Sequence, residues 1–258
     1  MDTKINQIPP EFIDEITGEI IYPESDGEPM AENTTHFQKI TTIQGGLDSL
    51  FASRTDVFVA GDLYWYPEEG KPHIRVALDI MVAFGRPKGH RSSYEQWNED
   101  HIAPQVVMEI LSPGNTVTEM LDKFIFYQKY QVQEYYVYDY RKNRFFAWKR
   151  EGERLDNVLI EPDYISPLLG VRFEIREDDL YIFNPDGTPF LTYVQIDAAR
   201  KEALALAEEE RKTKEEALAL AEEERKTKEE ALREENKALE ELTKLKNLLK
   251  SKGYQIDL

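Results

Sequence analysis

Five short runs of apolar and aromatic residues limit this chain to a fold built around a β-sheet. Turn residues separate the runs, which read DVFVAGDLYWYP, HIRVALDIMVAFG, APQVVMEILS, EYYVYDY and RFFAWKR. One helical stretch, TVTEMLDKFIFYQKYQV, lies among them. Several runs are apolar at successive positions, which is typical of strands covered by helices on both faces. The sequence therefore predicts a mixed α/β domain, expected over residues 36–198.

The segment before this domain is polar and rich in turn residues. Residues 1–35 predict an extended arm. A helix is expected to begin near Thr34 or Thr35, either of which would cap it. Its expected apolar face consists of Phe37, Ile40, Ile43, Leu47 and Leu50.

The chain ends in a charged repeat of 14 residues. EALALAEEERKTKE occupies residues 202–215 and recurs unchanged at 216–229. Glutamates precede lysines by four residues, an order worth roughly 0.2–0.5 kcal/mol of helix stability per pair. We expect a long helix over residues 199–252, stopped near Gly253, and a short tail over 253–258. Half of its heptad seam is charged, so a coiled coil, a helical hairpin and a solvated single helix all stay open.

The net charge of −18 is concentrated in the first part of the chain. Residues 199–258 hold 14 basic and 16 acidic residues, which leaves 18 basic and 34 acidic residues before them, a net charge of −16. Non-specific binding to nucleic acid depends on many Lys and Arg contacts to phosphate. Any nucleic-acid function must therefore use a local basic patch or metal ions.

Two carboxylates interrupt strands that are otherwise apolar. Glu109 shares a strand face with Val107, and Asp79 is expected to share one with Ala77 and Met81. An ionised carboxylate in such surroundings must be paired, protonated or bound to a metal. If the strands are neighbours, the two carboxylates can converge, and oxygen ligands of this type suit Mg²⁺ or Mn²⁺. A structural ion pair with Lys or Arg is the alternative.

A lysine follows on the inner stripe of the helical stretch. Met120, Lys123, Tyr127 and Tyr130 recur at helical spacing, and only the short loop SPGNT separates the helix from the strand of Glu109. Lys123 can snorkel to solvent, or it can reach back to the carboxylates. In the second case it would orient a nucleophilic water and stabilise the charge that develops on a phosphorane.

Several of these motifs together resemble a known family. GDLYWYPEEG, LDIMVAFGRPKGHRSSYEQW, PQVVMEILSPGNT, DKFIFYQKYQVQEYYVYD and SDGEPMAE are similar to segments of the Uma-two family, restriction-endonuclease-like proteins that belong to the PD-(D/E)XK nuclease superfamily. The resemblance covers roughly residues 20–195. It implies a mixed β-sheet of the restriction-endonuclease type flanked by helices, to which this chain adds a long C-terminal helix or coiled coil.

The resemblance also implies a metal site. Asp79 matches the superfamily's first acid and Glu109 its second, and the backbone carbonyl of Ile110 would be a further metal ligand. The superfamily often has a lysine two residues after the second acid, where this chain has leucine, and Lys123 in the following helix is its match. A further acid from the N-terminal part often completes the site.

Glu32 is the candidate for that further acid, with Glu28 behind it. The implied activity is endonucleolytic hydrolysis of phosphodiester bonds in nucleic acid, DNA in the first place, with Mg²⁺ or Mn²⁺ as the cofactor. A homodimer, through the nuclease domain or through the C-terminal helix, is compatible with this activity.

The remaining polar residues give weaker signals. His36, His73, His90 and His101 show no metal-ligand spacing, and we expect surface or capping positions for them. The segment GRPKGHR places Arg86, Lys88 and Arg91 close together, either as contacts to a phosphate backbone or as a solvated loop. The aromatic rows 64–66 and 135–138 are expected in the core and on the sheet.

Two classes of function follow from these features. The first is a metal-dependent endonuclease that uses Asp79, Glu109 and Lys123. The second is a non-catalytic interaction protein that keeps the nuclease-like fold and associates through its helical tail. The sequence contains no run of eighteen apolar residues, so no membrane span is predicted. The absence of cysteine fits a reducing cytoplasm.

Overall fold

The computed structural model describes residues 8–24 and 33–252. The chain divides into two units, one that extends to Val194 and one that begins at Gln195. The first unit carries the sheet, and the second is helical.

A seven-stranded mixed sheet forms the centre of the first unit, with the strand order β3-β1-β2-β4-β5-β6-β7. The pairs β4–β5 and β1–β3 are parallel, and the other neighbours are antiparallel. The five predicted strand runs are confirmed. The strands are β1 (Val57–Tyr66), β2 (Val76–Phe84), β3 (Tyr94–Glu95), β4 (Val106–Ile110), β5 (Glu134–Asp139), β6 (Arg144–Glu151) and β7 (Arg154–Val158).

A second, three-stranded antiparallel sheet and the helices cover this sheet. The small sheet has the order β10-β9-β8. Its strands are β8 (Tyr164–Ile165), β9 (Arg172–Ile175) and β10 (Leu180–Phe183). The helices are α1 (Thr34–Leu50) and α2 (Val117–Lys129), with short 3-10 turns at Pro10–Phe12 and Gln96–Asn98.

Both long helices of this unit begin at a side-chain cap. The cap of α1 is Asn33, whose side chain accepts hydrogen bonds from the backbone of Thr35 and His36, so neither predicted threonine is the cap. In α2, Thr116 and Glu119 form a reciprocal capping box. Because α2 connects the parallel strands β4 and β5, its start is fixed close to the end of β4.

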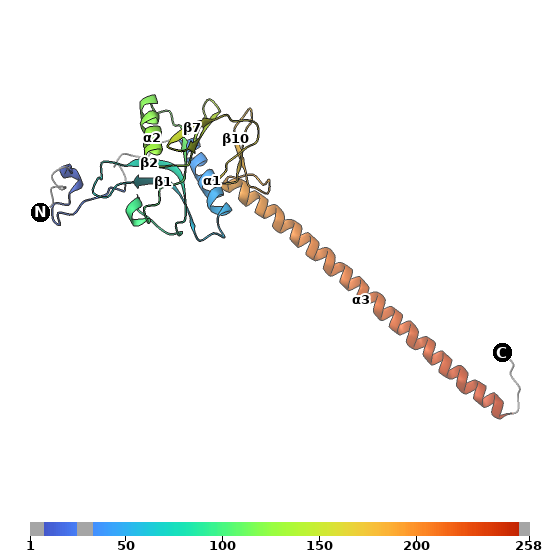
Figure 1. Cartoon of the computed structure of the whole chain (residues 1–258). Coiled ribbons are helices and arrows are strands. Elements are labelled where there is room, and N and C mark those ends of the chain that lie inside the picture. Colours follow the sequence, from blue (N-terminus) through green and yellow to red (C-terminus); the bar gives the residue numbers. More distant parts are fainter. Residues whose placement is uncertain (1–7, 25–32, 253–258) are drawn as a thin grey trace. The chain divides into compact units, whose positions relative to one another are not determined.

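Two apolar cores lie on the two faces of the large sheet. One contains Ile43 and Leu47 of α1 together with β9 and β10, and the other contains Tyr127 of α2. Figure 1 shows α1 and β10 to one side of the strands and α2 to the other. The expectation of helices on both faces is confirmed, with the small sheet sharing one face. The aromatic rows lie in these cores, where Trp65 and Tyr136 are fully buried.

The side-chain alternation of β2 breaks at Asp79. Leu78 packs on the α2 side of the sheet, whereas Ile80 packs on the α1 side. In a regular strand these two residues, two positions apart, would lie on the same face. Opposite this point, between the paired residues Gly61 and Leu63, Asp62 has a positive φ of 51°. An irregularity of this kind redirects a strand locally. The prediction that Ala77, Asp79 and Met81 share one face was therefore wrong in its assumption of regular alternation.

One unbroken helix, α3 (Tyr193–Ser251), forms the described part of the second unit as far as Ser251 and begins two residues before that unit. It has no buried side chain, and its leucines are exposed. Arg211 binds Glu208 and Glu215 within the helix. Because the helix is continuous from Tyr193 to Ser251, the alternative of a helical hairpin is excluded. The predicted stop at Gly253 lies outside the described residues. In the described part of the chain, no helix is both long and apolar enough to cross a membrane.

Candidate metal and nuclease site

Glu109 lies near the end of β4 and is only 2 % exposed. Its two carboxylate oxygens have separate donors, both from α2. Lys123 Nζ lies 2.6 Å from Oε2, and the hydroxyl of Tyr127 donates to Oε1. The buried acid is therefore charge-paired and hydrogen-bonded, as burial of a carboxylate requires.

Lys123 points inward, as its place on the helical stripe predicts. Its side chain is 15 % exposed, and Tyr127, one turn later, is fully buried. Besides Glu109, Nζ donates to the backbone carbonyl of Ala77 on β2 at 3.0 Å. The ammonium group therefore joins α2 to both β2 and β4, and it does not snorkel.

Asp79 contacts the end of β4 through a backbone group. Its Oδ2 accepts a hydrogen bond from the N–H of Ile110 at 2.7 Å. The ladder between β2 and β4 runs from Val82–Val106 to Ile80–Met108, so the next position along each strand is Asp79 and Glu109. The structure thus brings both acids to one point, where the two strands separate.

His36 is the residue that the sequence interpretation missed. The histidine was expected at a surface or capping position, yet it is 5 % exposed. Its Nε2 lies 2.8 Å from the carbonyl oxygen of Ile110 and 3.7 Å from Asp79 Oδ2. The signal was present in the helical spacing, because His36 precedes Ile40 and Ile43 by four and seven residues. Phe37, taken as the start of the stripe, is 63 % exposed. The other three histidines are exposed as expected.

The charges in this cluster shift one another's pKa values. Burial raises the pKa of Glu109 to about 7, and the charge of Asp79 raises it as well, while Lys123 and Tyr127 act in the opposite direction. Burial alone would lower the pKa of Lys123, but the charges of Glu109 and Asp79 outweigh it and raise that pKa. Burial, followed by the charge of Glu109, holds the pKa of Tyr127 well above its usual range. Lys123 is therefore cationic over the whole neutral range.

The donor atoms suit a hard divalent cation. Asp79, Glu109 and the Ile110 carbonyl supply oxygen only, the preference of Mg²⁺ and Mn²⁺. Tyr135, buried on β5, has a hydroxyl without a hydrogen-bond partner in the described part of the chain, and the charges of Glu109 and Asp79 add to the burial that raises its pKa. An orphaned hydroxyl beside the acids is the kind of group that a bound water satisfies.

The site is nevertheless incomplete in side-chain ligands. Within residues 8–24 and 33–252, no three His, Cys, Asp or Glu side chains form a metal-binding group. Each oxygen of Glu109 already has one donor, so an ion that binds this carboxylate would use a remaining lone pair of one of them. Glu32 and Glu28, the candidates for a further acid, lie outside the described residues.

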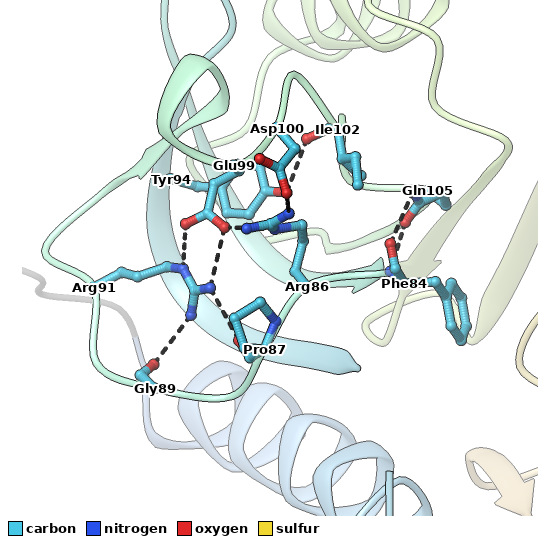
Figure 2. Close-up of polar contacts among 10 residues, drawn as sticks. All are labelled: Phe84, Arg86, Pro87, Gly89, Arg91, Tyr94, Glu99, Asp100, Ile102 and Gln105. Atoms are coloured by element: carbon cyan, nitrogen blue, oxygen red, sulfur yellow. Dashed lines mark hydrogen bonds and ion pairs between the residues drawn. The ribbon is translucent and has the colours of Figure 1, made fainter. Parts of the chain in front are cut away.

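The three basic residues proposed as phosphate contacts are each paired with a carboxylate. Figure 2 shows Glu99 between Arg86 and Arg91, which bind it at 2.9 Å and 2.5 Å. Both arginine side chains are close to buried, and both hold the loop between β2 and β4. Lys88 differs, because it and its partner Asp48 are 35 % and 52 % exposed.

A third acid is buried in a strand, but it belongs to a different arrangement. Glu134 on β5 is 1 % exposed and accepts hydrogen bonds from Ser166 Oγ at 2.5 Å, the backbone N–H of Leu168 at 2.9 Å and the hydroxyl of Tyr136 at 2.8 Å. All its donors are neutral. Glu134 therefore anchors the loop before β9 to the sheet.

Comparison with known proteins gives a family and a structural neighbour. A family described as "Putative restriction endonuclease" (Uma2) matches residues 16–182. A solved structure described as a putative nuclease belonging to DUF820 from Anabaena variabilis ATCC 29413 is 18 % identical, with a TM-score of 0.43, over 60 % of this chain and 80 % of that chain. No curated protein matches.

Proposed function

Because the chain belongs to the Uma2 family of putative restriction endonucleases, we propose that it is a metal-dependent endonuclease that hydrolyses phosphodiester bonds of nucleic acid. The observation that carries this proposal is the buried pair of Glu109 and Lys123 beside Asp79. A structural ion pair alone would not need a second carboxylate at the same point, since the second negative charge makes ionisation of the first less favourable.

The proposed roles follow from the contacts of each group. Asp79, Glu109 and the carbonyl of Ile110 would hold the ion, either Mg²⁺ or Mn²⁺. When bound, such an ion lowers the pKa of a water molecule and polarises a phosphoryl oxygen. Lys123, which is cationic at neutral pH, orients the attacking water with its ammonium protons and stabilises the negative charge that develops on the phosphate.

A cleavage assay with matched variants tests the proposal. We expect the wild type to cleave plasmid or oligonucleotide substrates in the presence of Mg²⁺ or Mn²⁺ and Asp79→Ala to be inactive. Asp156→Ala is the control, since this acid lies on the last strand of the sheet and is half exposed. Equal cleavage by wild type and Asp79→Ala, or no cleavage by either over a broad set of substrates and ions, would refute the assignment.

Double-stranded DNA is the substrate that we propose first, in a reducing cytoplasm that suits a chain without cysteine. The net charge of −16 on residues 1–198 repels a polyanion, so binding depends on local cations and on the metal ion. Among the three basic residues of the loop, Lys88 is the best candidate for a phosphate contact. Its exposed ion pair with Asp48 is worth little, so a phosphate can replace that carboxylate.

One observation favours a second candidate function, association through α3. The leucines Leu239, Leu242 and Leu245 near the end of the helix are at least half exposed. A second copy of the chain could cover them in a short coiled coil, which would give a homodimer whether or not the enzyme is active. Sedimentation equilibrium distinguishes the two, because Leu242→Glu would then convert a dimer into a monomer without changing cleavage per protomer. A homodimer through the nuclease domain would survive this substitution.

A further inference from the structure

His36 is a buried titratable group beside Asp79 that the proposed reaction does not use. It lies in the first turn of α1, and its ring is packed between the helix and the end of β4. Its Nε2 faces two of the atoms already assigned to the ion, the carbonyl oxygen of Ile110 at 2.8 Å and Asp79 Oδ2 at 3.7 Å.

These separations fall within the range of donors that share one ion, and the shorter one is also that of a hydrogen bond. With metal–donor distances of about 2.0–2.1 Å in an octahedral shell, neighbouring donors lie about 3 Å apart and opposite donors about 4 Å apart. Asp79 Oδ2 is itself held in place by the N–H of Ile110 at 2.7 Å. The imidazole nitrogen therefore lies within 4 Å of both the carboxylate oxygen and the carbonyl oxygen, and each of the three atoms comes from a different element.

We infer that His36 Nε2 is a further protein donor to the divalent ion, next to Asp79 and the carbonyl of Ile110. The inference rests on the proposed function for the existence of the ion. It goes beyond that function in the ligand set and in metal preference. An imidazole donor strengthens binding of Mn²⁺ and Co²⁺ relative to Mg²⁺, which prefers oxygen.

The protonation of the ring must change when the ion binds. In the ion-free protein Nε2 carries the proton and donates it to the carbonyl of Ile110, which can only accept. Coordination needs the lone pair of Nε2, so this nitrogen must give up its proton when the ion binds.

The simpler explanation is a hydrogen bond that only ties α1 to β4. His36→Gln separates the two, because the glutamine amide can still donate to Ile110 but offers no imidazole nitrogen. His73→Gln is the matched control, as His73 is exposed.

Pulsed electron paramagnetic resonance of bound Mn²⁺ gives a readout that does not depend on activity. We expect coupling to a histidine ¹⁴N nucleus in the wild type and in His73→Gln, and no such coupling in His36→Gln. Calorimetry should show at least about a tenfold loss of Mn²⁺ affinity in His36→Gln, with a smaller loss for Mg²⁺.

Suppose that Mn²⁺ binding depends on Asp79 but the spectrum shows no coupling to nitrogen. This result would overturn the inference and leave the proposed function standing. If Asp79→Asn weakens no Mn²⁺ binding at all, both the inference and the proposed function are overturned. The wild-type spectrum decides between these outcomes even if His36→Gln does not fold.

Discussion

Lys123 Nζ lies 2.6 Å from Glu109 Oε2, and the two side chains form a buried ion pair between α2 and β4. Only 13 residues separate them along the chain, because the loop after β4 is short and α2 begins at its capping box. Each partner removes the main cost of burying the other. Changes at this pair should therefore affect both stability and activity, in ways that can be separated.

Replacement of the lysine alone should be severe. Lys123→Met leaves the carboxylate of Glu109 without its cation, and we expect a loss of about 3–5 kcal/mol in the free energy of unfolding at neutral pH, together with loss of cleavage. The double variant Lys123→Met/Glu109→Gln should recover most of the stability but none of the activity. Urea denaturation and the cleavage assay measure the two effects. If the double variant is no more stable than Lys123→Met, the unpaired charge of Glu109 is not the cause of the lost stability.

The raised pKa of Glu109 predicts a specific pH dependence for the metal-free protein. The folded-state pKa of about 7 exceeds the ordinary value of 4.5, so the folded protein binds more protons than the unfolded chain between these pH values. The free energy of unfolding should therefore fall as the pH rises from about 4.5 to 7, by on the order of 3 kcal/mol from this group. In Glu109→Gln this contribution should disappear. The free energy of unfolding is measured for both proteins in the presence of EDTA at several pH values. If it depends on pH in the same way in both, Glu109 is not the group responsible.

The other buried acid should behave differently. Glu134→Gln removes a charged acceptor from Ser166 and Leu168, and we expect a loss of about 1–3 kcal/mol in the free energy of unfolding. Because Glu134 has no part in the proposed site, Mn²⁺ affinity should be unchanged. Calorimetry of this variant beside Glu109→Gln makes the comparison. A weaker Mn²⁺ affinity in both would mean that the two acids act on one site.

Lys88 should affect nucleic-acid binding without affecting the fold. Lys88→Ala should lower affinity for DNA uniformly across sequences and reduce the slope of log affinity against log salt by about one. Arg86→Gln should instead lower stability, since it leaves Glu99 with one cation fewer. Fluorescence anisotropy over a range of salt concentrations provides the measurement. An unchanged slope in Lys88→Ala would exclude this lysine as a phosphate contact.

The sequence predicted the strands and the inward lysine because both depend on local periodicity. The runs around Asp79 and Glu109 are apolar on both faces, and Lys123 lies on a stripe with Tyr127, so neither prediction needed long-range information. His36 was missed for a local reason as well. The stripe of α1 was started one residue too late, at Phe37.

Other features could not have been predicted from local patterns. Glu109 and Glu134 look alike in sequence, since each is an acid in an apolar strand. Their donors decide between them, and the donors of Glu134 at Ser166 and Leu168 lie more than 30 residues away. The positive φ of Asp62, which lies opposite Asp79 on β1, was also not predicted from the apolar pattern of the strand.

The place of the lysine on α2 has a consequence for how such sites can change during evolution. The cation and its buried acid travel together in one continuous piece of chain, from Val106 to Lys129, whereas Asp79 is contributed from outside it. Recombination at the ends of this piece would transfer the matched pair intact to another sheet. The recipient would need to supply only a carboxylate on the adjoining antiparallel strand to regenerate the arrangement of Asp79, Glu109 and Lys123.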